Sequence, residues 1–170
     1  MKLVIHDLTE KDFKRLFPDL PKNVTVVSPE KSVHPCIGCL CCFTRTPGYC
    51  ILRDDYQQMG EVVSKISEMV IISKNCYGSF SPYVKNVIDR CLPYQLPFFE
   101  IRQGKMYQKI RYENRIHFSV HMYSDPDITM TEKEQELARK FTENYCASLN
   151  GTGSTIAFYG NPSAMKGVIL

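Results

Sequence analysis

Five of the eight cysteines of this chain fall within fifteen residues, and their spacing is typical of a ligand set for a metal or a cluster. Cys36, Cys39, Cys42 and Cys50 read C-x2-C-x2-C-x7-C, with Cys41 adjacent and left over. Thiolates spaced in this way on an irregular backbone can converge on one centre, which favours an iron–sulfur cluster of the 4Fe-4S type. Zinc is the weaker alternative, because structural zinc sites more often use two separated pairs. A metal-free loop of small buried thiols is the third.

A second group of residues suited to ligand binding follows the β-branched run that ends at Ser73. A flavin ring needs backbone N–H groups near its polar edge, and small residues let the backbone approach it. Five consecutive residues offer such a loop, with the tyrosine placed to pack against the ring: Asn75, Cys76, Tyr77, Gly78 and Ser79. Tyr123 and Ser124, after a later strand, are candidates to flank the same ring. An ordinary turn is the alternative at the Tyr77 loop and the favoured interpretation at Tyr123 and Ser124.

The first loop of the chain lacks the residues that usually hold a nucleotide phosphate. A phosphate normally sits on a turn rich in glycine, serine or threonine at the start of a helix, where free N–H groups favour an anion. Here the loop carries Asp7, Glu10 and Asp12, and no glycine precedes the cysteine run. These carboxylates repel a phosphate, so we expect a degenerate phosphate-binding loop. Either Arg45 or Arg53 of the cysteine loop holds the phosphate, or the flavin has been lost.

Strand and helix patterns alternate along the chain, and these elements must position the groups described above. Apolar and β-branched runs predict five strands, at Lys2–His6, Val24–Ser28, Val70–Ser73, Ile116–Met122 and Ser154–Tyr159. Four helices are predicted between them. One is capped by Thr9, one by Asp54 or Asp55, one opens at Ser81-Pro82, and one has a capping box of Thr131 and Glu134.

This alternation predicts an α/β protein with a three-layer, doubly wound parallel five-stranded sheet in the flavodoxin-like order 2-1-3-4-5. We expect a single domain over residues 1–170, with a cysteine-rich loop at 34–53 and an irregular insertion at about 93–114. Ligands of such sheets bind beyond the carboxyl ends of the strands. Because the cysteine loop follows the second strand, we expect it at that same edge, near the Tyr77 loop.

Composition and charge argue against several classes of partner. The net charge is +3 and the lysines and arginines are dispersed, so no nucleic-acid partner is expected. No apolar run approaches the roughly 20 residues that span a bilayer, so no membrane partner is expected. The first residues do not form a signal-peptide pattern, which predicts a cytoplasmic protein with reduced thiols.

The two motif blocks together resemble a known family. The cysteine block continues through Thr46-Pro47-Gly48 to Asp54-Asp55, and the tyrosine block continues to Lys85 and Asp89-Arg90. This pattern, over roughly residues 36 to 160, is similar to that of the NADPH-dependent FMN reductase and iron–sulfur flavoprotein family. The resemblance implies a flavodoxin-like fold, FMN, a nicotinamide donor with an unknown acceptor, and a homodimer or homotetramer. The segment 98–112, rich in aromatic and basic residues, either covers an active site or forms an oligomer surface, and we expect the oligomer surface.

Two functions follow as hypotheses. The first is an FMN-dependent oxidoreductase or electron-transfer flavoprotein of the NAD(P)H:FMN reductase type, with an iron–sulfur cluster as an additional centre. The second is a flavodoxin-like binding or assembly module that has lost its flavin phosphate site. The acidic first loop motivates the second hypothesis, and the Tyr77 loop motivates the first. The sequence identifies no catalytic residue for either.

Overall fold

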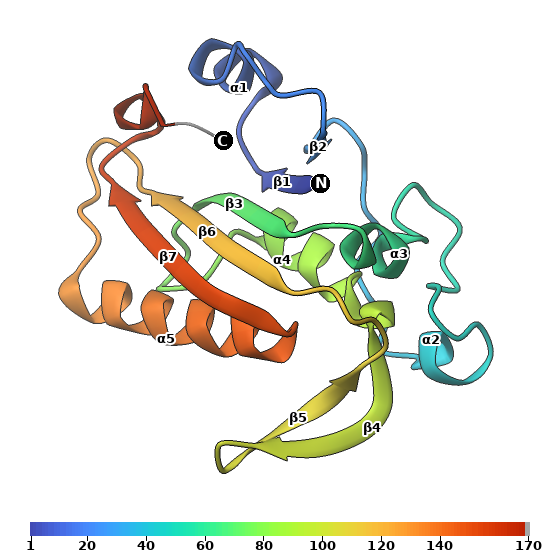
Figure 1. The fold of residues 1–170 in the computed structure, drawn as a ribbon. Helices are drawn as coiled ribbons and strands as arrows, with labels where there is room; N and C mark the ends of the chain where they lie inside the picture. Colours follow the sequence, from blue (N-terminus) through green and yellow to red (C-terminus); the bar gives the residue numbers. More distant parts are fainter. Residues whose placement is uncertain (169–170) are drawn as a thin grey trace.

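A five-stranded parallel sheet organises the chain, which the computed structural model describes over residues 1–168 (Figure 1). Its strands, in spatial order, are β2 (Val24–Val27), β1 (Lys2–His6), β3 (Glu68–Lys74), β6 (Ile116–Tyr123) and β7 (Gly151–Tyr159). Every neighbouring pair in this sheet is parallel. When only these strands are counted along the chain, the order is 2-1-3-4-5, so the predicted flavodoxin-like α/β fold is confirmed.

Helices cover both faces of this sheet. The helices of the described residues are α1 (Glu10–Leu16), α2 (Cys41–Thr44), α3 (Met59–Ser64), α4 (Pro82–Asp89) and α5 (Glu132–Ser148), with the short 3-10 helices η1 (Leu92–Tyr94) and η2 (Pro162–Met165). Of these, α2 packs against η1 and not on the sheet. The predicted caps of α4 and α5 are confirmed: Ser81 caps α4, and Thr131 forms a reciprocal capping box with Glu134. In residues 1–168 no helix has the length and apolar character needed to cross a membrane.

Two apolar cores lie on opposite faces of the sheet. Along β1, Leu3 and Ile5 belong to the larger core, which α3, α4 and α5 close. Val4 belongs to the smaller core, which α1 and η2 close. A strand buried on both faces needs apolar residues at consecutive positions. This requirement explains the unbroken apolar runs of β1 and β3.

The segment 93–114 is a β-hairpin, so the prediction of an irregular insertion was wrong. Strands β4 (Gln95–Arg102) and β5 (Lys105–Ile110) pair antiparallel outside the main sheet and project from it (Figure 1). The connection at Gln103 and Gly104 has two positive φ angles, 51° and 75°, as a tight hairpin turn requires. Pro97 and a shift in register between Gln95 and Phe99 interrupt the alternation of side chains. Because of this interruption, the pattern of apolar and polar residues does not predict a strand here.

The helix expected to begin at Asp54 or Asp55 begins later, at Met59, with Gln58 in the capping position. Asp54 does not cap it, because its carboxylate is held by Arg90. The residues between Asp54 and Gln58 form turns instead. The predicted cap was therefore wrong.

His6, the last residue of β1, is buried between the sheet and α1. It is 1% exposed, and its ring stacks on Phe13 with centroids 3.9 Å apart and planes 7° from parallel. Burial lowers the pKa of His6 to about 4, against a partial opposing effect of a hydrogen bond with the backbone of Leu8. At neutral pH this imidazole is therefore uncharged and packs as an aromatic ring.

We expect the protein to lose stability as the pH falls from about 6.5 to about 4 because of His6. In that window the unfolded chain binds a proton that the folded chain does not, so the free energy of unfolding decreases as the pH falls. The full effect is on the order of 3 kcal/mol. His6→Phe keeps the stacking and should flatten this pH dependence in urea unfolding experiments. His34→Gln, at an exposed position, is the control. An unchanged pH profile for His6→Phe would contradict the assignment.

Candidate functional site

A tight turn presents Tyr77 at the edge where the parallel strands end, here called the carboxyl edge. The turn follows β3, and two backbone hydrogen bonds close it, from Cys76 N to Ser79 O (2.9 Å) and from Ser79 N to Cys76 O (3.0 Å). Tyr77 and Gly78 both have positive φ, 56° and 81°. The Tyr77 side chain projects from this turn and is 91% exposed. An aromatic ring is thus held out into solvent at the ligand edge of the sheet.

Contacts with α5 fix the turn in place. The side-chain oxygen of Asn75 accepts a hydrogen bond from Gly78 N (2.9 Å), and its amide nitrogen donates to Glu134 (3.2 Å). A Cβ atom at Gly78 would lie 2.8 Å from the Glu134 carbonyl oxygen and from Leu137, so a glycine is required by space as well as by φ. The position of Tyr77 is therefore set before any ligand arrives.

The residues predicted to bind the cofactor meet at this carboxyl edge. Asn75 N donates to Tyr123 O (2.7 Å), and Ser124 N donates to Tyr159 O (3.1 Å), which brings the ends of β3, β6 and β7 together. Tyr123 and Ser124 are buried, at 8% and 4% exposure. Their direct contact with a ring stays a prediction.

The carboxylate of Asp7 occupies the point between β1 and β3 where strand order reverses. One of its oxygens accepts from Lys74 N (2.8 Å) and lies 3.4 Å from the Ser73 hydroxyl, and the other accepts from the Tyr123 hydroxyl (2.9 Å). Burial, together with this carboxylate, raises the pKa of Tyr123 well above its usual value. A fixed negative charge therefore sits at the centre of the ligand edge.

The start of α1 does not fit a phosphate. The Thr9 hydroxyl accepts from Asp12 N (3.1 Å) and donates to the Asp12 carboxylate (2.8 Å), so the cap is complete within the helix. Glu10 and Asp12 make the first turn acidic. Lys74 at the same edge is paired with Asp125 at 2.7 Å. The acidic cap expected from the sequence is confirmed, and its carboxylates repel a phosphate from the start of this helix.

The cysteine loop lies at the opposite edge of the sheet, where the strands begin, so the expectation that it adjoins Tyr77 was wrong. After β2, Ser28 O accepts from the Tyr83 hydroxyl near the start of α4, and His34 O accepts from Arg90 just after its end (2.8 Å). The chain thus follows α4 along its length. Gly48 then packs beside Arg111 in the segment that precedes β6. In Figure 1, α2 lies near the start of β6, away from its arrowhead.

Because the cysteine loop lies at this edge, its two arginines cannot hold the phosphate of a flavin bound at the Tyr77 turn of the same chain. Arg45 follows α2 directly, and Arg53 adjoins Leu52, whose carbonyl faces Arg90 beyond the end of α4. Both residues therefore belong to the edge where the strands begin. Neither serves a ligand at the Tyr77 turn of the same chain.

The four thiols predicted as metal ligands lie near one another but in different environments. Cys36 and Cys39 are exposed, Cys42 is buried and Cys50 is half-buried. Burial raises the pKa of Cys42 to about 11, and the neighbouring thiols of Cys50, Cys36 and Cys39 add to this effect. Among the described residues, no three histidine, cysteine or acidic side chains are grouped as metal ligands. As folded here the thiols do not form a finished ligand set, and their ligand role stays a prediction.

A buried ion pair holds the cysteine loop on α4. Arg90 donates to both carboxylate oxygens of Asp54, each at 2.7 Å, with the two side chains 0% and 9% exposed. Arg90 also reaches His34 O (2.8 Å), and Asp54 accepts from the N–H groups of Tyr56 (3.0 Å) and His34 (3.3 Å). Although burial works to raise it, these hydrogen bonds hold the pKa of Asp54 below its usual value.

The contact between Asp54 and Arg90 is not predicted from the sequence, in which Asp54 is expected to cap a helix and Arg90 belongs only to a motif. The available signal was an arginine at the end of an apolar helix face together with an acid just after the cysteine run. Such an arginine needs a partner when it is buried.

Comparisons with known proteins agree with this fold. No family model matches the chain. An iron–sulfur flavoprotein of Archaeoglobus fulgidus is 31% identical over 64 residues, which is 38% of this chain and 28% of that protein, so the match spans little more than a quarter of the relative. An FMN-dependent NADH-azoreductase of Bacillus anthracis, solved with FMN, superposes with a TM-score of 0.55 at 12% identity, over 97% of this chain and 92% of that one.

Two further solved structures have a similar fold. An NADPH-quinone reductase of P. pentosaceus gives a TM-score of 0.52 at 12% identity, over 96% of this chain and 90% of that one. General stress protein 14 of Treponema denticola, solved with FMN, gives 0.51 at 13% identity, over 96% and 88%. At these identities the likeness establishes the flavodoxin-like fold.

We expect Asp54→Ala to destabilise the protein by about 3–5 kcal/mol, because it leaves the Arg90 guanidinium buried without its counter-charge. Urea unfolding measures this loss, and hydrogen exchange should show the segment 34–54 exchanging faster. Asp55→Ala is the matched control. Asp55 is exposed and pairs with exposed Lys31 at 3.3 Å, so its loss should change stability by less than about 1 kcal/mol. Equal effects of the two substitutions would contradict this account.

Proposed function

We propose that the protein is an FMN-dependent oxidoreductase or electron-transfer flavoprotein of the NAD(P)H:FMN reductase type. The observation that carries the proposal is the rigid presentation of Tyr77 at the carboxyl edge of a flavodoxin-like sheet, where such sheets bind their ligands. Two proteins of the same fold were solved with FMN. When bound, FMN supplies two-electron chemistry between a nicotinamide donor and an acceptor.

In this proposal the Tyr77 side chain stacks on one face of the flavin ring. Aromatic stacking contributes about 0.5–1.5 kcal/mol beyond the apolar area that it buries. The ring of Tyr77 needs no rearrangement of the backbone, because Asn75 and Gly78 already fix the turn. A loop that is ordered in advance loses less entropy when a ligand binds. Tyr123 and Ser124 complete the edge on which the ring rests.

The phosphate of FMN contributes little to binding under this proposal. Asp7 and the acids of α1 face the place where flavodoxin-like proteins take an anion, and like charges repel. Binding therefore depends on the flavin ring, which FMN shares with riboflavin. Because the two ligands differ only in the phosphate, they separate the contribution of the ring from that of the anion.

We expect FMN and riboflavin to bind with dissociation constants within about threefold of each other, measured by quenching of flavin fluorescence. Tyr77→Ala should weaken both by about tenfold, whereas Tyr77→Phe should retain binding. Asp7→Asn should strengthen the binding of FMN and leave the binding of riboflavin unchanged. Tyr49→Ala, which removes a half-exposed tyrosine at the other edge of the sheet, is the control. Quenching that does not saturate with either flavin would overturn the proposal.

The hydrogen bonds accepted by the Asp7 carboxylate favour a second candidate function, that of a flavodoxin-like binding or assembly module that has lost its flavin phosphate site. In this alternative the carboxylate of Asp7 occupies the hydrogen-bonding groups at the strand ends, so that none is left for a ligand phosphate. The titration above separates the two candidates. Saturable flavin binding followed by bleaching of the flavin with NADH or NADPH excludes the module, and the lack of any flavin binding supports it.

We also propose that Cys36, Cys39, Cys42 and Cys50 bind a 4Fe-4S cluster, with zinc as the less favoured occupant. The spacing of the thiols and the name of the A. fulgidus relative support this assignment. The loop must bring its two exposed thiols toward the two less exposed ones for the set to close. No step of the flavin chemistry depends on this centre.

We expect protein purified without oxygen to contain about four iron atoms and four sulfides per chain. Cys39→Ser should remove most of this iron, because it deletes a ligand. Cys76→Ser should retain it, because Cys76 lies in the turn at the opposite edge. Zinc without sulfide would support the zinc alternative. Protein that binds neither metal, even after reconstitution with iron and sulfide, would contradict the ligand set.

We propose a cytoplasmic location, supported by eight free cysteines that suit a reducing compartment. We propose a small-molecule nicotinamide donor and no nucleic-acid partner, supported by the low net charge of +3. The family resemblance supports a homodimer or homotetramer.

A further inference from the structure

A cavity of about 490 Å³ lies between α1 and β2, on the face of the sheet that α1 covers. This volume lies within the range of about 300–1,000 Å³ that small-molecule sites usually have. None of the residues that line the cavity belongs to the Tyr77 turn, to β6 or to β7. The cavity is therefore separate from the residues proposed to hold a flavin.

The shortness of α1 accounts for this cavity. The helix has only seven residues, and Pro18, which cannot continue a helix, directly follows its cap residue Phe17. Alternate residues of a strand share a face, and Val24 of β2 packs against the smaller core on this face. Val26 lies two residues further along β2 and stays 37% exposed. Together with Phe13 and Phe17, it gives the cavity apolar walls.

His6 lines the buried end of the cavity and brings an unused polar atom to it. Its side chain is 1% exposed, and its ring nitrogen Nδ1 has no hydrogen-bond partner among the described residues. Buried polar groups of folded proteins are nearly always paired, so an unpaired one calls for an explanation. In the neutral imidazole, Nδ1 is a donor or an acceptor according to the tautomer. A hydroxyl group both donates and accepts, so it can pair with Nδ1 in either tautomer.

The exposed rim of the cavity carries two acids and one lysine, namely Glu10, Glu30 and Lys14. Lys14 donates a hydrogen bond to the carboxylate of Glu10 within α1. The carboxyl group of Glu10 raises the pKa of Glu30, which means that the two acids lie close together. Because one lysine offsets only one of the two carboxylates, the rim keeps an excess of negative charge. A rim of this kind attracts a cationic group.

We propose that this cavity binds a small aromatic amine whose ring carries a hydroxyl group. The aromatic ring packs against Phe13, Phe17 and Val26. The hydroxyl group pairs with Nδ1 of His6 at the buried end, and the ammonium group lies beside Glu30 at the rim. The acidic rim selects against carboxylic acids, and the unpaired nitrogen selects against purely apolar molecules. The proposal does not depend on flavin binding.

Three probes test the proposal: tyramine, 2-phenylethylamine, which lacks the hydroxyl group, and 4-ethylphenol, which lacks the amine. Nuclear magnetic resonance titrations of the full chain, labelled with nitrogen-15 and free of flavin, measure the three dissociation constants. Binding of tyramine should saturate with a dissociation constant of about 0.1–10 mM, and shift changes should centre on α1 and β2. Tyramine should bind more tightly than either other probe by about threefold or more. Titrations with tyramine that do not saturate, or shift changes centred on the Tyr77 turn, would refute the proposal.

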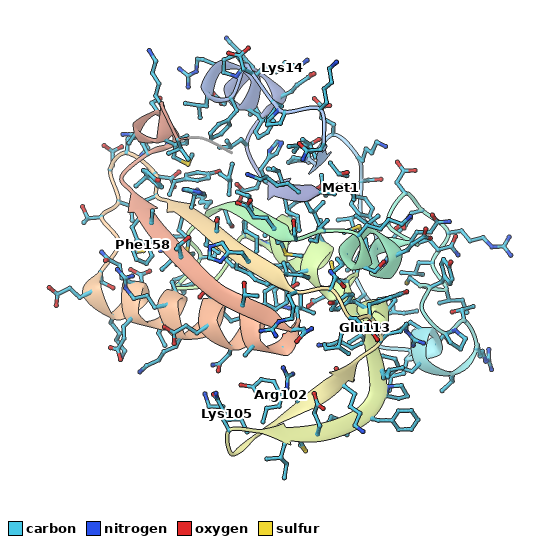
Figure 2. The ribbon with its side chains drawn as sticks, in the orientation of Figure 1. Met1, Lys14, Arg102, Lys105, Glu113 and Phe158 are labelled. Carbon is cyan, nitrogen blue, oxygen red and sulfur yellow. The ribbon has the colours of Figure 1, made fainter. Side chains whose placement is uncertain are left out.

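Two substitutions test the individual contacts. His6→Phe keeps a ring stacked on Phe13 but removes Nδ1, so tyramine and 2-phenylethylamine should then bind equally well. Glu30→Gln removes a charge from the rim, so tyramine should lose its advantage over 4-ethylphenol. Glu113→Gln is the control, because Glu113 is exposed and Figure 2 shows it far from Lys14 of the rim. Circular dichroism verifies that each variant is folded. If either preference survives its substitution in a folded variant, the proposed contact is wrong.

Discussion

The buried pair of Arg90 and Asp54 decides where the cysteine loop lies. A guanidinium that is taken out of water needs a carboxylate, and removing either partner leaves an uncompensated charge. Because Arg90 follows the end of α4, its partner must come to that end of the helix. The chain between β2 and α3 is drawn along α4 as a result, and the thiols come to rest beside η1. This ion pair thus keeps the cysteine loop away from the carboxyl edge of the sheet.

The carboxylate of Asp7 determines how the strand ends are joined at the carboxyl edge. Asp7 accepts hydrogen bonds from the backbone of Lys74 and from the Tyr123 hydroxyl, so its carboxylate ties together the ends of β1, β3 and β6. The same carboxylate that joins the strands also repels an anion at this edge of the sheet. Under the proposed function, structural cohesion and ligand selectivity are therefore coupled at this position. A ligand that binds here through a neutral ring avoids the conflict, which is why the ring carries the proposed recognition.

Local signals in the sequence were sufficient for the sheet and for most of its helix starts. Consecutive apolar residues in β1 and β3 report burial on both faces, and Thr131 with Glu134 closes a cap within four residues. The wrong predictions about Asp54 and the cysteine loop depend on a contact between residues that lie far apart in the sequence. Asp54 and Arg90 lie 36 residues apart, and no local pattern reports their pairing. The hairpin was missed because Pro97 and a shifted register break the alternation on which strand prediction depends.

The exposure of Tyr77 supports the proposal that its side chain serves a ligand outside the fold. A residue with a Cβ atom at φ 56° costs about 1 kcal/mol, and glycine or asparagine suits such a turn better. The ring recovers none of this through packing, since it is 91% exposed. Because Gln103 adopts the same positive φ in the hairpin turn, the exposure of the ring, and not the backbone conformation, supports the proposed role of Tyr77. Fold stability alone gives no reason for a tyrosine here, whereas contact with a planar ligand does.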